Sequence, residues 1–204
     1  SLYDVQPKMV LHKGKTACSL LEKAPRVSIA PAVCDTVHIA PVKRSDLRLR
    51  INKDPVPVIV PIPRQIITKR VNEHVHVRNG YFVSDACHQK VAVIERHHAS
   101  GNIGLGIIRG FLRTGAIAAT VGHDAHNLIV IGTNDTDMLL AIHALNESGG
   151  GYVIVKDQSI VAGIELEIAG LMSTHSRRIW IPIKHCLSFR FLSCRDCALR
   201  TKVF

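Results

Sequence analysis

The stretch NLIVIGTNDTDMLLAIHALNESGGGYVIVKDQSI, residues 127–160, contains the clearest secondary-structure pattern in the sequence. It begins with an apolar run that is typical of a buried strand. The segment 135–151 then predicts a helix, because Asp135 can cap its start and Asp137 favours its positive end. Gly149 is expected to stop this helix. An apolar run follows it. A strand, a helix and a further strand in succession predict layers of sheet and helix.

The rest of the chain adds further predicted strands. Prolines within the apolar run 56–63 favour an edge strand there. The glycine-rich segment 101–115 is interpreted as a flexible crossover, since it lacks the spacing of a dinucleotide site. Residues 17–54 show no period and predict a surface connector. Strands are expected at 8–11, 66–77, 81–83, 91–95, 116–121 and 127–132, with turns at Gly14 and Asn79-Gly80 and a hairpin over 152–170 that turns at 156–159. The expected fold is α/β, close to α+β, with a mixed sheet and few helices.

The charge and composition limit the function classes. The chain of 204 residues has a net charge of +10, of which +6 falls in residues 173–204, so the rest is only mildly basic. Basic and aromatic residues do not interleave, as a single-strand nucleic-acid surface requires. No apolar run reaches the ~18 residues of a membrane span, and the first residues show no secretory signal pattern. We expect a soluble cytoplasmic protein that binds neither nucleic acid nor a membrane.

Six cysteines raise the question of a metal site. Cys18, Cys34 and Cys87 are scattered singly, as reduced thiols of the cytosol are. A second group near the carboxyl end has donor atoms that suit zinc, but its histidine and first cysteine are adjacent in sequence and adjacent side chains rarely converge on one ion. An incidental cluster is the other interpretation. The members of this group are His185, Cys186, Cys194 and Cys197.

The His-x-His pattern of His74 and His76 has two interpretations. On a strand, both imidazoles would point to one face, as metal-dependent hydrolases require. Such a site would need further ligands, another histidine and an aspartate, at later strand ends. The alternative is a solvent-facing alternation in a strand that ends at the Asn79-Gly80 turn.

Polar side chains also gather at the ends of two predicted buried strands. Strand ends hold side chains rigidly beside an open crevice, and a carboxylate there can orient a histidine. The alternative is a capping network in which Asp and Asn satisfy turn amides and the histidines pack against them. Local chemistry leaves both open. The residues are Glu95, Arg96 and His97 after one strand, and His123, Asp124, His126 and Asn127 before the other.

The order of several motifs resembles a known family. VAVIERHHASGNIGLGIIRGF, GAIAATVGHDAHNLIVIGTNDTDMLLAI, GGGYVIVKD and ELEIAGLMST are similar to the carboxy-terminal domain of bacterial adenine deaminase, of the amidohydrolase superfamily. The resemblance runs from Val91 to Thr174. It extends more weakly upstream, through IVPIPRQIITKRV and DVQPKMVLHKGK. It implies a domain at 55–174, preceded at 1–54 by a remnant of a post-barrel strand and a connector. After GLMST the irregular basic tail 175–204 departs from the family, as a frameshift or an eroded gene end would make it.

The resemblance also implies an activity. In that family a metal-bound hydroxide attacks C6 of adenine, giving hypoxanthine and ammonia. The ligands lie on an amino-terminal barrel that holds manganese or iron, and the chain begins where that barrel would end. We therefore expect this chain to bind no metal itself and to be inactive without a barrel, supplied by a separate polypeptide. A homo-oligomer is the other expected partnership.

Three hypotheses follow from the resemblance. In the first, the chain is the carboxy-terminal part of an adenine deaminase, and the seven strand-end residues listed above close the active site over the substrate without binding metal. In the second, it is a stand-alone purine-binding or interaction module. In the third, it is a non-functional gene remnant whose exposed barrel-facing surface makes it poorly soluble.

Overall fold

The computed structural model describes residues 9–17, 28–63 and 65–173. The chain divides into two compact units, residues 1–30 and 31–204. Within the described ranges, no helix is both long enough and apolar enough to cross a membrane.

The first unit contains a short hairpin. Strands β1 (Leu11–His12) and β2 (Lys15–Thr16) pair antiparallel. Gly14 lies in the turn between them with φ +73°, a conformation that glycine adopts without a steric penalty. The turn predicted at Gly14 is confirmed.

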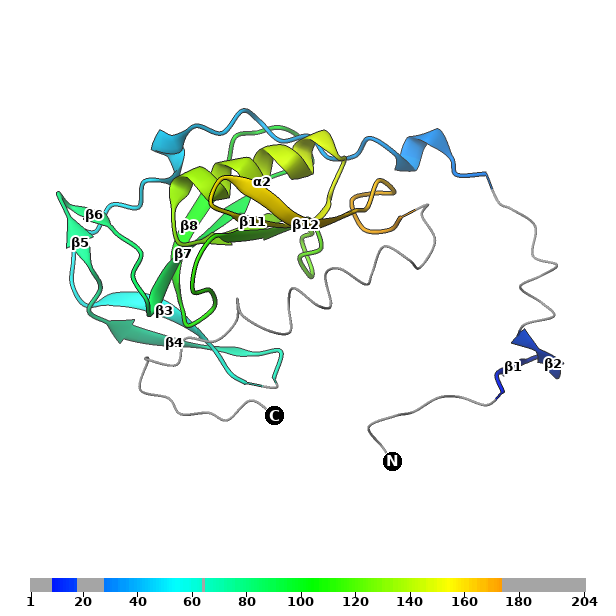
Figure 1. Ribbon diagram of the computed structural model, residues 1–204, viewed down its shortest axis with the longest axis horizontal. Coiled ribbons are helices and arrows are strands. Elements are labelled where there is room, and N and C mark those ends of the chain that lie inside the picture. Colours follow the sequence, from blue (N-terminus) through cyan, green and yellow to red (C-terminus); the bar gives the residue numbers. More distant parts are fainter. Residues whose placement is uncertain (1–8, 18–27, 64, 174–204) are drawn as a thin grey trace. The chain divides into compact units, whose positions relative to one another are not determined.

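The second unit contains a mixed sheet of eight strands, covered on one face by the helix α2 (Asp135–Glu147) (Figure 1). Neighbouring strands are antiparallel except β3 and β8, which are parallel. This arrangement confirms the predicted mixed sheet of an α/β fold. In order across the sheet, the strands are β12 (Ser159–Glu165), β11 (Gly151–Lys156), β9 (Ala116–Ala119), β10 (Leu128–Gly132), β7 (His88–Ile94), β8 (Ile103–Arg109), β3 (Val56–Pro61) and β4 (Thr68–Glu73).

Successive side chains of a strand point to opposite faces of the sheet. The central strand β10 carries apolar side chains on both of these faces. In β10, Leu128 and Val130 are fully buried on the face that packs against α2. Ile129 and Ile131 of the same strand pack on the other face. Strand β10 therefore appears in the sequence as a continuous apolar run without a polar alternation.

Helix α2 forms for the reasons that the sequence indicates, with one correction. The residues Met138, Ala141, Ile142 and Leu145 recur at helical spacing and are buried against the sheet. The prediction that Asp135 caps the helix is wrong. Asn134 is the cap, and its side-chain oxygen accepts a hydrogen bond of 2.8 Å from the Asp137 amide.

The turns follow the predictions. Asp157 and Gln158 both have positive φ, at 50° and 60°, and join β11 to β12 as a tight two-residue hairpin. A smaller hairpin of β5 (Val77–Arg78) and β6 (Tyr81–Phe82) turns at Asn79 and Gly80, as predicted.

Two predictions about the sheet are wrong. β3 is not an edge strand, because it lies between β8 and β4. Its prolines are tolerated because its pairing with β8 is confined to Ile59 opposite Ile108, so few backbone donors are needed there. The glycine-rich segment is not a crossover. It forms β8, which pairs with β7 over seven positions, and the side chain of Val91 occupies the space over Gly106.

Residues 31–54 are irregular, as predicted, apart from the short 3-10 helices η1 (Pro31–Val33) and η2 (Arg44–Leu47). They are more than a surface connector, however. Val42 and the fully buried Leu47 belong to the main core under α2. The sequence pattern missed this because isolated apolar residues in an aperiodic segment carry no periodic signal.

We expect Gly132→Ala to lower the free energy of unfolding by about 1–3 kcal/mol, because a Cβ at this position would lie 2.3 Å from Cγ of the buried Met138. Gly104→Ala is the matched control in the same sheet, since its nearest atom would be the Val93 carbonyl oxygen at 3.9 Å. Urea denaturation measures both variants. Equal stabilities would contradict this account of the contact between β10 and α2.

Candidate functional site

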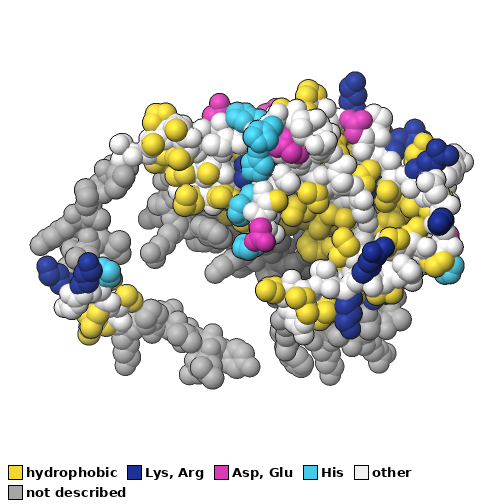
Figure 2. Space-filling view, turned by 180° about the vertical axis from the view of Figure 1, so that it is seen from behind, with side chains coloured by type: hydrophobic (Ala, Val, Ile, Leu, Met, Phe, Trp, Pro, Cys, Tyr) yellow, Lys and Arg dark blue, Asp and Glu magenta, His cyan; other side chains and the backbone are white. Residues whose placement is uncertain are grey.

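The two strand-end groups predicted from the sequence meet in the structure. Strands β7 and β10 are antiparallel neighbours with Ile94 opposite Leu128, so the end of β7 lies beside the start of β10. We call this polar rim of the sheet the histidine edge; its residues are Glu95, Arg96, His97, His123, Asp124, His126 and Asn127. The second unit, viewed from the side opposite to that of Figure 1, carries a column of histidine side chains with acidic side chains beside it (Figure 2).

Arg96 is the buried residue that holds this edge together. Its side chain is only 2% exposed, and its guanidinium donates from Nε to the His126 carbonyl oxygen and from Nη2 to the Ala169 carbonyl oxygen, the latter at 3.2 Å. Its own carbonyl accepts from the His38 amide at 2.7 Å. Burial lowers the pKa of Arg96. A Cβ at Gly170 would lie 2.8 Å from Nη1, so only glycine leaves room for the guanidinium there.

Hydrogen bonds fix the loop between β9 and β10 around this arginine. His97 donates from Nε2 to the Ala125 carbonyl oxygen at 3.0 Å. The His126 amide donates to the Gly122 carbonyl oxygen at 2.5 Å. The side-chain atoms His126 Nδ1 and Asn127 Oδ1 are buried within the described part of the chain and have no hydrogen-bond partner there. The hydrogen bonds described for this loop are therefore made by its backbone groups.

The tip of the loop carries a solvent-exposed ion pair. His123 Nδ1 contacts Asp124 Oδ1, and the two side chains are 89% and 86% exposed. An exposed pair of this kind contributes about 0–1 kcal/mol to folding, so stability does not account for it. The His123 and His126 rings lie edge to face with centroids 6.3 Å apart. The tip thus presents the Asp124 carboxylate and the His123 imidazole to solvent, whereas His126 is half-buried.

Glu95 organises the turn after β7. Its carboxylate accepts from the amides of His97 and His98 and from both the amide and the hydroxyl of Ser100. These hydrogen bonds, the one from the Ser100 amide foremost, lower the pKa of Glu95 to about 2 against an opposing effect of burial. Glu95 thus satisfies turn amides, a role that the capping alternative had given to Asp and Asn. Asn127 Oδ1 has no partner within the described residues, and Asp124 is exposed and contacts His123.

The other candidate residues lie apart from this edge. His74 and His76 follow the end of β4, and His74 Nδ1 lies 2.9 Å from Asp54 Oδ2. The described ranges contain no group of three or more His, Cys, Asp or Glu side chains that could hold a metal ion, so the residues present there do not fit one. The predicted zinc candidates His185, Cys186, Cys194 and Cys197 lie outside the described residues.

Sequence reasoning missed a buried polar cluster at the other end of β7. Glu73 contacts His88 Nε2 at 2.8 Å with one carboxylate oxygen and pairs with Arg109 through the other. Lys90 pairs with Asp135 at the start of α2. The available signal was the run of polar residues 88–90 placed directly before an apolar strand. These pairs join strands and helix and lie at the start of β7, whereas the histidine edge lies at its end.

We expect Arg96→Met to lower the free energy of unfolding by about 2–4 kcal/mol, because two half-buried segments lose a charged hydrogen-bond donor to their carbonyl groups. Amide exchange over residues 122–127 should accelerate by more than the global loss of stability explains. Arg113→Met, at an exposed arginine, is the control and should change stability by no more than about 0.5 kcal/mol. Equal effects of the two variants would show that Arg96 does not hold the loop.

Glu95 should titrate near pH 2 in a carbon-detected NMR pH series of the side-chain carboxyl. Since the folded pKa lies below its usual value, the stability linked to Glu95 is present above pH ~4.5 and is lost as the pH falls toward 2. Ser100→Ala removes one of the four donors and should raise the midpoint part of the way. A midpoint at the usual value would contradict the hydrogen-bonded turn.

Comparisons with known proteins agree with the resemblance. The family model described as adenine deaminase C-terminal domain matches residues 65–181, more than half of the chain. The adenine deaminase of Dehalococcoides mccartyi is 40% identical over 81% of this chain, which covers 30% of that protein. The adenine deaminase of Clostridium acetobutylicum is 41% identical over 86% of this chain, which covers 32% of that protein. The chain thus spans about a third of the length of these relatives. It belongs to the adenine deaminase C-terminal domain family.

Proposed function

We propose that this chain serves as the carboxy-terminal part of an adenine deaminase. In the reaction, an oxygen atom from water bonds to C6 of adenine, the bond from C6 to the amino nitrogen breaks, and hypoxanthine and ammonia are released. The chemistry takes place on the portion of the enzyme that corresponds to the remaining two thirds of the relatives' length. The chain contributes the histidine edge, which closes that site over the purine.

One observation carries the proposal: relatives named adenine deaminase match most of this chain at about 40% identity while the match covers about 30% of their length. At that identity the chain is expected to share its relatives' fold and their docking with the rest of the enzyme. The corresponding partner is the portion of the enzyme that carries the barrel. We place the assembly in the cytoplasm, where a purine-salvaging hydrolase meets its substrate.

The geometry of the histidine edge supports a role in substrate positioning. A purine presents ring nitrogens that accept hydrogen bonds and N–H groups that donate them. Asp124 offers acceptor oxygens and His123 a ring nitrogen, and both are exposed at the tip of a loop that the buried Arg96 holds from beneath. Recognition by such fixed polar groups costs little ordering entropy when the ligand binds.

The metal of the reaction, manganese or iron, would be held by the barrel and would supply the activated water. The exposed residues of the histidine edge would act on the purine instead. His123 and Asp124 would orient the base, and His97 would keep the loop in place through its hydrogen bond to Ala125. Closure of the loop over the site would exclude bulk water.

A chimera tests the proposal. The matched carboxy-terminal part of the Clostridium acetobutylicum enzyme is replaced by this chain, and hypoxanthine formation is measured with manganese present. We expect the chimera to deaminate adenine, and Asp124→Asn together with His123→Ala to lower kcat/KM by about 10- to 1000-fold, as loss of positioning contacts does. The matched control is His74→Ala, at an exposed histidine away from the edge, which should retain activity.

Measurements on residues 1–204 without the rest of the enzyme complete the test. Adenine deamination by residues 1–204 alone with manganese, at the rate of the chimera, would contradict the dependence on a barrel. Calorimetric binding of adenine by the chain alone without turnover would favour a purine-binding module instead. Full activity of the chimera that carries both substitutions would remove the histidine edge from the proposed role.

A further inference from the structure

The two edges of the large sheet differ in chemistry. The outer strand β4 carries the charged residues Lys69 and Arg70, which discourage pairing with another strand. The strand β12 at the opposite edge has no charged residue from Ser159 to Ile164, and Ile160 and Val161 are 54% and 46% exposed. Among the described residues, β12 pairs only with β11. An apolar edge of this kind is a template for a further strand.

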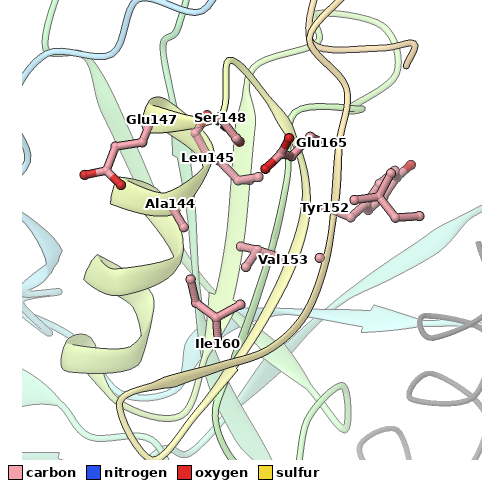
Figure 3. Close-up of a pocket in the computed structure, with 10 residues that line it drawn as sticks. Ala144, Leu145, Glu147, Ser148, Tyr152, Val153, Ile160 and Glu165 are labelled. Carbon is pink, nitrogen blue, oxygen red and sulfur yellow. Dashed lines mark hydrogen bonds between the residues drawn. The ribbon is translucent and has the colours of Figure 1, made fainter. Parts of the chain in front are cut away.

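A pocket of about 500 Å³ lies along this edge, between β12 and the carboxyl-terminal half of α2 (Figure 3). Gly163 helps to create it, because it places no side chain between the strand and the helix. Ile160 and Val153 lie toward one end of the pocket, while Ser148 and Glu165 lie toward the other. Glu147 lines the same end from α2, with its carboxylate directed away from β12. The pocket thus has an apolar end and an acidic end.

The charged residues that line the pocket indicate what kind of segment would bind in it. Glu147 and Glu165 line the pocket, and among the residues that the structure describes no lysine or arginine does. The last turn of α2 also lacks a basic residue, so the negative end of its dipole meets Glu147 without compensation from the helix itself. A second copy of β12 would bring no positive charge, since its only charged residue is Glu165. A partner segment with basic residues next to apolar ones would neutralise this end.

We propose that β12 and α2 form a docking groove for an extended segment of a partner protein that carries basic residues beside small apolar ones. The segment adds to the sheet as a strand next to β12, and its backbone pairs with the outer edge of β12. Its alternate apolar side chains fill the pocket over Gly163, and its basic residues lie at the end of the groove formed by Glu147 and Glu165. This inference is independent of the proposed deaminase function, because the peptide binding that tests it is measured without adenine.

The test uses the full chain and a fluorescent peptide in which two arginines precede alternating valines and threonines. Fluorescence anisotropy should show saturable binding that weakens with salt. An otherwise identical peptide with N-methylated backbone amides at alternate positions should lose binding in one of its two possible patterns, because a methyl group blocks pairing with the strand edge. A peptide with glutamates in place of the arginines should not bind.

Variants of the protein test whether the peptide binds in the groove between β12 and α2. Glu147→Gln with Glu165→Gln should weaken peptide binding about three- to tenfold, the range of two exposed ion pairs, whereas Asp54→Asn should leave it unchanged. Ala144→Leu extends a side chain into the pocket and should also weaken binding, while His143→Leu, the exposed neighbour on the same helix, should not.

Three results would overturn the proposal. The first is equal affinity of the parent peptide and both N-methylated peptides, a comparison that needs no variant protein. The second is unchanged affinity in the double glutamine variant. The third is a dimer that Ile160→Lys dissociates in sedimentation, together with no peptide binding, which would make a second copy the occupant of the edge.

Discussion

A buried guanidinium determines the geometry of the polar rim of this protein. Arg96 lies at the end of a central strand, almost without solvent exposure, and donates to carbonyl groups of two segments far apart in sequence. Removing a cation from water costs several kcal/mol unless its donors are satisfied. The loop at 122–127 and the segment at 168–170 must therefore hold their carbonyl oxygens toward it. Gly170 is part of the same constraint, since a larger residue would collide with the guanidinium.

Because of this constraint, the histidine edge consists of residues that fix the backbone and residues that are exposed to solvent. Glu95 and Arg96 both form hydrogen bonds with backbone groups. Glu95 orders the turn after β7. Arg96 orders the loop before β10. His123 and Asp124 contact each other at the loop tip and are open to solvent. A rigid sheet that carries an exposed polar loop is the usual way in which folds present binding residues. The proposal that the loop closes the substrate site depends on this division.

Sequence reasoning was most successful where local physics decides the structure. The helix, the hairpin after it and the runs that form β9 and β10 carry strong periodic or apolar signals, and tertiary contacts reinforce them. It was wrong about β3 and β8, because strand order is decided by pairing between segments distant in sequence. Prolines suggested an edge and glycines a flexible crossover, yet both segments lie inside the sheet. The sequence also brought together the right residues for the histidine edge but could not show that Arg96 is buried, since burial depends on segments 30 and 73 residues away.

A crystal structure of the chimera with adenine bound would test the central claim most directly. The claim predicts that the loop tip lies against the mouth of the active site, with a side-chain atom of His123 or Asp124 within hydrogen-bond distance of the purine and Arg96 still bonded to the loop carbonyl. A loop that faces solvent on the side away from the bound purine would contradict it.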